Sequence, residues 1–276
     1  MADIPSGDRA PDASARPKGL DRPIRKRVKK LGKRLTRRLA AYQARQSLVP
    51  DAPFLEAERF AFLAPLQRHW PEIEAEARDL LKHREHIPGF QEVSPDQYRI
   101  ATESNWRTLF LFGFGERIEG NCRMMPRTAE LIERAGSVHT AWVSILTPGY
   151  RIPPHTGVTK GILRAHLGLL IPEDRENCWI RVGDERRSYA PGSLFVIDDT
   201  YEHEVHNDTD EDRVVLLLDF DRPMRFGGRM LTALFLRIMK LTAFYQEPKR
   251  NIRDHEARLA AAAERANETL ESMSDR

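Results

Sequence analysis

Residues 138–172 read VHTAWVSILTPGYRIPPHTGVTKGILRAHLGLLIP, and this stretch decides the fold class. Apolar runs at 138–147 and 163–171 lie on either side of a Pro-Gly turn and a Pro-Pro-His segment. Short strands rich in Val, Ile and Leu, repeated every 8 to 12 residues or so, are typical of antiparallel sandwiches and barrels. We therefore expect a mainly β protein with flanking helices and a jelly-roll core. Further runs of this kind follow at 178–183, 193–197, 203–206 and 213–220.

We place this core at residues 137–223, and the rest of the chain divides into segments of different composition. Helices are expected within 54–86, broken near Pro65 and Pro71, and at 126–136, where Pro126 opens a helix. The other segments are a disordered N-terminus (1–20), a basic amphipathic helix (21–50), a helical or mixed part before the core (51–136), an apolar helix (224–250) and a polar C-terminal helix (251–276) whose role the sequence leaves open.

The basic charge of the chain is concentrated near the N-terminus. Residues 1–50 carry 14 Lys/Arg and 4 Asp/Glu, a net charge of +10, whereas the whole chain has +3. Within 22–45, apolar residues recur every three or four positions among 11 Lys/Arg. This pattern predicts a helix on an anionic membrane surface, and the alternative is a solvated helix that packs on the body. We do not expect nucleic-acid binding, because aromatic residues are not interleaved and the remaining chain is acidic.

A second candidate for membrane contact is the apolar run 230–245. It contains Arg237 and Lys240 and is too short to span a bilayer. The sequence leaves open whether it lies in the membrane interface or covers the barrel. Two cysteines, too few for a zinc site, and the lack of an apolar N-terminal stretch predict a reducing, cytoplasmic location. Oligomeric state cannot be predicted from these features.

Two histidines within the strand-rich region are candidate metal ligands. His155 lies just past the Pro-Gly turn, and His203 begins an apolar strand 48 residues later. In a jelly roll such segments can lie side by side, and the two imidazoles would then hold Fe, Zn, Cu or Ni. Carboxylates around His203 are candidates to orient its ring, as partners of metal-bound histidines often do. They are Asp198, Asp199, Glu202 and Glu204.

Cationic side chains are expected beside this pair. Arg213 begins an apolar strand, where a guanidinium is costly unless it meets a carboxylate. Arg164 and His166 are two residues apart and therefore share one face of another strand. The candidate site thus combines two metal ligands with cations that could hold a dicarboxylate.

Three motifs in this region resemble the aspartyl/asparaginyl β-hydroxylase family. They are Ser144–Gly157, which contains Pro-Pro-His155, then Leu163–Pro172, and Asp198–Val205 followed by Arg213 and Asp219. The resemblance implies a double-stranded β-helix, cupin-like, that uses Fe(II), 2-oxoglutarate and O2. It implies His155 and His203 as iron ligands, Ser144 and Arg213 at the distal carboxylate of 2-oxoglutarate, His166 near its chelating end, and Arg164 near the substrate.

The residue two positions after His155 bears on which enzymes the chain resembles. Most 2-oxoglutarate oxygenases place a carboxylate ligand there, whereas this chain has Gly157. The hydroxylase family that the chain resembles also lacks this carboxylate. The glycine therefore agrees with the resemblance.

Ile162 bears on the substrate. The animal peptidyl hydroxylases of the family carry an arginine at this position, and an apolar side chain fits an acyl chain better than a peptide carboxylate. The chain also resembles the bacterial lipid A fatty-acyl 2-hydroxylases, to which ornithine-lipid hydroxylases are related. We therefore expect a hydroxylase of membrane-lipid acyl chains, peripheral on the cytoplasmic face of the inner membrane. The alternatives are a hydroxylase of a protein or small molecule and a binding module without activity.

Overall fold

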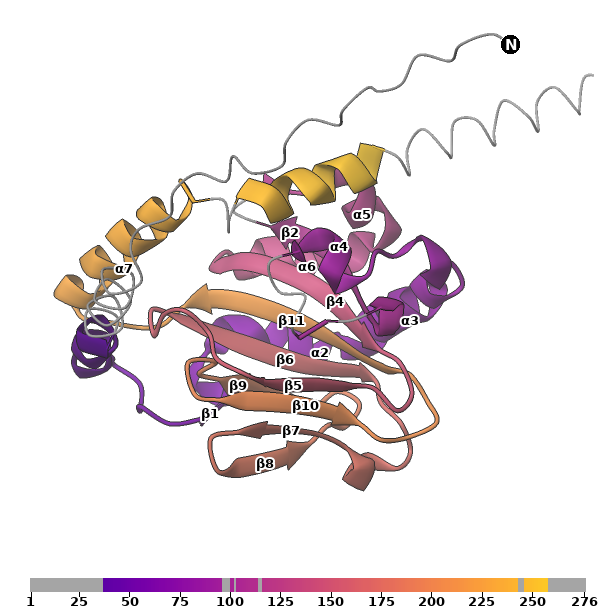
Figure 1. Cartoon of the computed structure of the whole chain (residues 1–276), viewed down its shortest axis with the longest axis horizontal. Helices are drawn as coiled ribbons and strands as arrows, with labels where there is room; N and C mark the ends of the chain where they lie inside the picture. Colours follow the sequence, from indigo (N-terminus) through magenta and orange to yellow (C-terminus); the bar gives the residue numbers. More distant parts are fainter. Residues whose placement is uncertain (1–36, 96–99, 102, 114–115, 243–245, 258–276) are drawn as a thin grey trace, which may run out of the picture. The chain divides into compact units, whose positions relative to one another are not determined.

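The structure is a computed structural model, and it describes residues 37–95, 100–101, 103–113, 116–242 and 246–257 (Figure 1). The chain divides into two compact units, residues 1–41 and residues 42–276. In the first unit, the described residues 37–41 are helical. The expectations for 1–20, for most of the basic helix and for 258–276 fall on residues outside the described ranges. All that follows concerns the second unit.

The larger of its sheets contains seven antiparallel strands in the order β1-β9-β6-β11-β4-β2-β3. Its central strands β6, β11 and β4 pair over almost their whole length. The strands are β1 (Phe54–Glu56), β2 (Trp106–Gly113), β3 (Glu116–Arg117), β4 (Val138–Leu146), β6 (Ile162–Leu170), β9 (Leu194–Ile197) and β11 (Arg213–Asp221). Three of these strands precede residue 137, so the β core draws on chain outside the 137–223 region expected from the sequence.

The smaller sheet has four strands in the order β5-β10-β7-β8. They are β5 (Arg151–His155), β10 (His203–Asn207), β7 (Cys178–Val182) and β8 (Glu185–Ser188). Figure 1 shows this sheet alongside β6, β9 and β11 of the larger one. The two antiparallel sheets form the jelly-roll, cupin-like core that the strand spacing predicted.

Side chains alternate between the two faces of the larger sheet and form a separate hydrophobic core on each face. Val214, Leu216 and Leu218 of β11 belong to a cluster with the helices, whereas Val215 and Leu217 belong to a cluster between the sheets. Successive strand residues point to opposite faces, so this alternation fixes which side chains line the space between the sheets. That inner face carries the candidate site.

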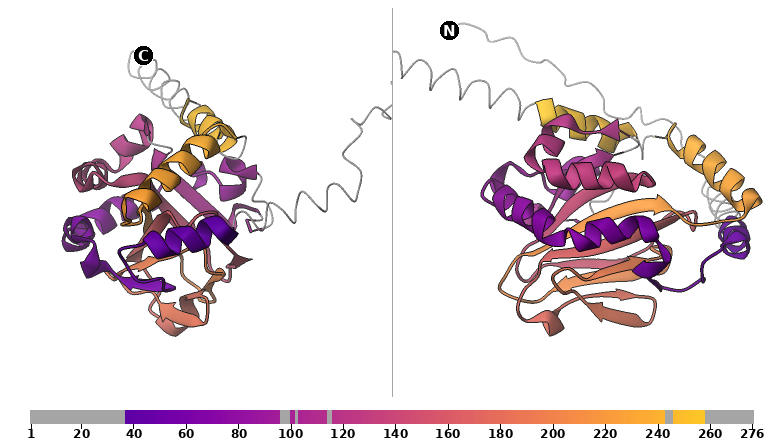
Figure 2. Two further views of the ribbon diagram at one scale, coloured as in Figure 1. Left: turned by 90° about the vertical axis from the view of Figure 1, so that its left-hand side faces the viewer. Right: turned by 180° about the vertical axis from the view of Figure 1, so that it is seen from behind.

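Helices cover the outer face of the larger sheet. Of the main ones, α6 contacts both α2 and α3, while α3 also contacts β6 and α6 also contacts β4 (Figure 2). Pro65, Pro71 and Pro126 each occupy the first turn of a helix, where proline is tolerated because no N–H partner is needed there. Pro65 and Pro71 therefore begin helices. The helices are α2 (Ala64–Arg68), α3 (Trp70–Leu81), α4 (Phe90–Val93), α5 (Glu119–Met124), α6 (Pro126–Ala135) and α7 (Phe226–Met239), with short 3₁₀ turns at Ala57–Arg59, Ala61–Leu63, Arg84–His86, Glu103–Asn105 and Arg175–Asn177.

Two helices follow β11 in the described part of the chain. The apolar run forms α7, which begins at Phe226, four residues before the run predicted from the sequence. Residues 246–257 form a second helix. Lys249 and Arg253 of this helix form ion pairs with Glu116, and the side-chain amide of Asn251 donates a hydrogen bond to the carbonyl oxygen of Val93. Within the described part of the chain, no helix combines the length and hydrophobicity needed to cross a bilayer.

Candidate active site

A cavity of about 1210 Å³ lies between the two sheets and extends to α7. It is lined by all seven residues predicted as metal ligands, 2-oxoglutarate contacts or substrate contacts: Ser144, His155, Ile162, Arg164, His166, His203 and Arg213. Ligand cavities commonly have about 300–1,000 Å³, so this one is large. The fold therefore brings these seven residues into one space from five strands, β4, β5, β6, β10 and β11.

His155 and His203 come from neighbouring strands of the smaller sheet. Their Cα atoms are direct partners in the pairing of β5 with β10, and their ring centroids are 4.0 Å apart. The Nδ1–H of His155 donates to the carbonyl oxygen of Pro153 at 2.9 Å, and that of His203 to Tyr201 at 3.0 Å. A carbonyl oxygen can only accept, so each ring has its unprotonated nitrogen at Nε2. Both Nε2 atoms thus remain available to a metal.

Burial keeps this pair neutral. It lowers the pKa of His155, and it lowers the pKa of His203 to about 3, with the nearby His155 adding to the effect. The neutral imidazole is the form that binds metals. Among the described residues, no group of three or more His, Cys, Asp or Glu side chains is placed to hold a metal ion. The structure therefore offers a metal two protein ligands.

The expectation that a carboxylate orients His203 is wrong, since the Tyr201 carbonyl oxygen does so. Three of the four acidic neighbours are bound elsewhere: Asp198 pairs with Lys160 and Arg222, and Glu202 and Glu204 pair with Arg181. In a β strand, side chains of consecutive residues alternate between faces, so sequence neighbours of His203 need not face its ring.

Asp199 lies next to Gly157. The Gly157 N–H donates to the Asp199 carbonyl oxygen at 2.6 Å, and a Cβ at residue 157 would overlap the Asp199 carboxylate. Burial raises the pKa of this carboxyl to about 6, although Arg164, 3.6 Å away, acts in the opposite direction. A side chain at residue 157 would therefore have to displace the Asp199 carboxylate.

This contact predicts the effect of Gly157→Ala. We expect the free energy of unfolding in urea to fall by about 1–3 kcal/mol, as for other insertions into tightly packed sites. When Gly157→Ala is made in the Asp199→Ala variant, the loss of unfolding free energy should be much smaller, because the overlapping carboxylate is absent. Gly113→Ala is the control, since a Cβ there meets only ordinary contacts of 3.6 Å or more. If Gly157→Ala lowered the free energy of unfolding equally in the wild type and in Asp199→Ala, the overlap with the Asp199 carboxylate would be contradicted.

Arg213 lies on the opposite sheet and is 1% exposed. Its Nε and Nη2 find no hydrogen-bond partner among the described residues, and its guanidinium lies over the Tyr189 ring at 5.2 Å. A buried cation without a partner is costly and signals a missing anion. Ser144 is also buried, and its Oγ accepts a hydrogen bond from Trp106 at 3.0 Å, which leaves the hydroxyl proton free for the cavity.

His166 completes this polar wall. Its Nδ1 is 3.2 Å from the Tyr189 hydroxyl, its ring stacks on Phe195, and its buried Nε2 has no partner in the described chain. Burial lowers the pKa of His166 well below its usual value, and the cations of Arg164 and Arg213 add to this. The ring is therefore neutral and presents one unsatisfied nitrogen to the cavity.

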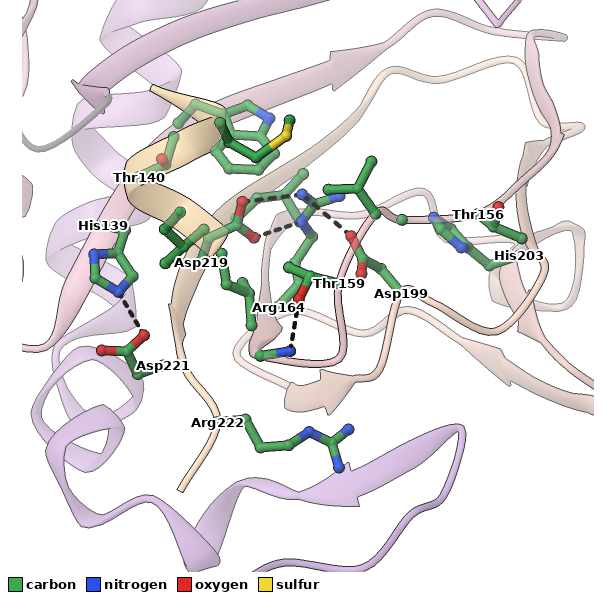
Figure 3. Close-up of a pocket in the computed structure, with 18 of the residues that line it drawn as sticks. His139, Thr140, Thr156, Thr159, Arg164, Asp199, His203, Asp219, Asp221 and Arg222 are labelled. Atoms are coloured by element: carbon green, nitrogen blue, oxygen red, sulfur yellow. Dashed lines mark hydrogen bonds and ion pairs between the residues drawn. The ribbon is translucent and has the colours of Figure 1, made fainter. Parts of the chain in front are cut away.

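Arg164 is held by acidic partners. Its guanidinium donates to both carboxylate oxygens of Asp219, at 2.7 and 3.0 Å, and lies over the Trp142 ring. Figure 3 shows Arg164 between Asp219 and Asp199, with His203 beyond Asp199. This charge is largely neutralised, so Arg164 contributes to the wall and to the placement of Asp199. Sequence reasoning did not find this role for Asp219, which follows from its direct pairing with Arg164 across β11 and β6.

The cavity wall between these polar groups and α7 is apolar. Phe110, Trp142 and Leu217 face the interior from the larger sheet, and Leu236 and Met239 face it from α7. Ile162 also lines the cavity, as its position on the same face as Arg164 predicts. No sequence motif marked these wall residues, although their positions follow from the strand alternation.

The family model for aspartyl/asparaginyl beta-hydroxylase matches residues 67–223, more than half of the 276-residue chain. The chain belongs to the aspartyl/asparaginyl β-hydroxylase family. The matched region contains both histidines and every strand of the two sheets except β1. This hydroxylase family membership confirms the resemblance seen in the three motifs.

Individual members of the aspartyl/asparaginyl β-hydroxylase family differ in how much of their length matches. An ornithine lipid ester-linked acyl 2-hydroxylase from Rhizobium tropici is 34% identical over 214 residues, 78% of this chain and 76% of that protein. Human aspartyl/asparaginyl beta-hydroxylase is 31% identical over 166 residues, and the chain covers only 21% of its length. Aspartate beta-hydroxylase domain-containing protein 2 from Xenopus tropicalis is 30% identical, with 56% of its length covered.

The comparison with solved structures gives matches over a limited share of this chain. A predicted oxalate decarboxylase from Thermotoga maritima matches with 15% identity and a TM-score of 0.27, over 33% of this chain and 72% of that one. KdgF from Halomonas sp. matches with 13% identity and a TM-score of 0.28, over 46% of this chain and 86% of that one.

Proposed function

We propose that this chain is an Fe(II)- and 2-oxoglutarate-dependent hydroxylase acting on a fatty-acyl chain of a membrane lipid. The observation that carries the proposal is the cavity, which joins the His155–His203 pair to a long apolar space. Its polar end offers ligands for a metal and a dicarboxylate, and its apolar end suits a hydrocarbon chain.

The residues at the polar end fit iron and 2-oxoglutarate. His155 and His203 would hold the metal through Nε2, since Nδ1 of each ring is already bound to a carbonyl oxygen. Arg213 would pair with the distal carboxylate, supported by the Ser144 hydroxyl, and such a charge-assisted contact would satisfy the unpartnered guanidinium. When bound, Fe(II) with 2-oxoglutarate and O2 supplies the oxidising power that replaces a C–H hydrogen by a hydroxyl group.

The protein itself would position the substrate and exclude water. Trp142, Phe110 and Leu217 present apolar surface to a chain that approaches the histidines. Arg164 offers a substrate little free charge, because Asp219 and Asp199 surround its guanidinium. This favours an uncharged acyl segment at the reacting position over the carboxylate of an aspartyl peptide.

The similarity to the Rhizobium tropici protein supports an ornithine-lipid type of substrate, since the match covers most of both chains. A lipid A type of acyl chain offers the same chemistry near the metal. The competing hypothesis, hydroxylation of a protein or small molecule, rests on relatives of which the chain covers a much smaller share.

The test is a comparison of substrate classes with the full chain, Fe(II), 2-oxoglutarate and air. We expect an ornithine lipid or a lipid A precursor to gain one oxygen atom on an acyl chain, by mass spectrometry, with one succinate formed per product. An aspartyl peptide should remain unchanged. The lipids of cells with and without the gene should differ in the same way. A hydroxylated peptide with unmodified lipids would reject the proposal in favour of the competing hypothesis.

A further inference from the structure

Helix α7 exposes a continuous apolar stripe. Phe226, Met230, Leu234, Ile238 and Leu241 follow one another at intervals of four, four, four and three residues, and each is 54–83% exposed. Side chains at this spacing lie along one side of a helix. Among the described residues, most of the large, strongly exposed apolar side chains belong to this one stripe.

The other side of α7 is fixed to the body. Gln43 donates from Nε2 to the hydroxyls of both Thr159 and Thr232, each at 3.0 Å. A Cβ on Gly228 would come within 2.6 Å of Gln46, so only glycine allows the helix this close. Leu236 and Met239, also on this inner side, line the cavity. The helix therefore separates the apolar stripe from the cavity by its own width.

The charges on α7 have a single sign. The segment 225–241 carries Arg225, Arg229, Arg237 and Lys240 and no Asp or Glu. Arg229, Arg237 and Lys240 line the cavity and are also exposed, so they lie at its mouth. A helix with one apolar side flanked by cations is typical of a segment in the interface of an anionic membrane.

We propose that the stripe of α7 inserts into the interface of an anionic lipid bilayer, so that the cavity opens at the membrane surface. The proposal rests on the proposed function, since an acyl substrate must leave the bilayer to reach the histidines. The lipid surface is favoured over another protein because every charged residue of the segment 225–241 is a cation. Insertion of the stripe would place the mouth of the cavity, where Arg229, Arg237 and Lys240 lie, at the depth of the lipid headgroups.

The first experiment measures binding of the full chain to vesicles of phosphatidylglycerol and phosphatidylcholine. Replacing both Leu234 and Ile238 by serine should weaken partitioning by at least about tenfold, because two large apolar side chains lose their place in the interface. Neither residue lines the cavity. Met124→Ser, on α5, is the matched control with another exposed apolar residue and should bind like the wild type.

A second experiment distinguishes insertion of α7 from binding through the basic residues 22–45. Those residues could attach the chain to vesicles even if α7 stayed outside the bilayer. A fluorophore on Leu234→Cys should shift to the blue with these vesicles and be quenched by spin-labelled lipids. The same fluorophore on Met124→Cys should do neither. Both native cysteines are buried, so labelling at the new site is selective.

The outcomes distinguish this proposal from the proposed function. The double serine variant should retain turnover on detergent-dispersed lipid and lose it on vesicles. An unshifted fluorophore at position 234, or a double variant that changes only the oligomeric state, would overturn insertion and assign the stripe to contact with protein. Absence of lipid turnover in the wild type would instead reject the proposed function, and the vesicle measurements would still stand.

Discussion

His203→Ala should abolish turnover and metal binding together, while the fold is retained. The substitution removes one of the two imidazoles that the structure offers a metal, and His155 alone cannot replace the pair. His155→Ala should have the same effect. Titration with Fe(II) without oxygen, or with Co(II) followed by its visible spectrum, measures the metal directly. We expect at least about a hundredfold weaker binding, more than the 10- to 100-fold typical of changes in the residues that orient ligands.

His206 provides the control for both variants. It lies on the same strand as His203, three residues later, but its ring stacks on Trp179 and does not line the cavity. His206→Ala should therefore bind metal and turn over substrate like the wild type. Unchanged metal binding in His203→Ala would show that the metal, if any, lies elsewhere.

The central strands could be predicted from the sequence because they are buried and apolar. Five strands lie outside the predicted apolar runs, and four of them, β1, β3, β5 and β8, are at the edges of their sheets. The edge strand β5 contains two prolines, and β8 consists of polar residues only. Edge strands need neither two apolar faces nor every backbone N–H, so their sequences lack the usual signal. Residues at 54–56 accordingly resembled the start of a helix.

The sequence was enough to predict which residues line the candidate site. It was not enough to predict which of their side chains contact one another. Pro-Pro-His155 and the acid-rich segment at His203 pointed to the two histidines that the structure places opposite each other on β5 and β10. The pairing of Arg164 with Asp219, by contrast, depends on the register between β6 and β11. The Tyr201 carbonyl oxygen that orients His203 carries no side-chain signal at all. Motifs therefore pointed to residues that line the cavity, and pairing register decided which charged side chains are already paired with one another.

Arg213→Met should stabilise the protein while it abolishes activity. The wild-type guanidinium is buried, and two of its nitrogens have no partner in the described chain. Its removal relieves a desolvation cost, whereas the contact with Tyr189 contributes only about 1–2 kcal/mol. Replacing buried charges by apolar side chains often gains about 1–4 kcal/mol. We therefore expect the free energy of unfolding without ligand to rise by about 1–3 kcal/mol.

Addition of 2-oxoglutarate should make the wild type more stable than Arg213→Met. Ligand that binds only the folded state raises its stability, by about 2.7 kcal/mol at one hundred times the dissociation constant. The wild type should gain this increment in urea unfolding with Fe(II) and 2-oxoglutarate, and Arg213→Met should gain almost none. Arg164→Met is the comparison: it leaves Asp219 and Asp199 buried without their cation and should destabilise the protein. If Arg213→Met instead lost stability without ligand, the guanidinium would have a partner in the free protein, and its assignment to the dicarboxylate would fail.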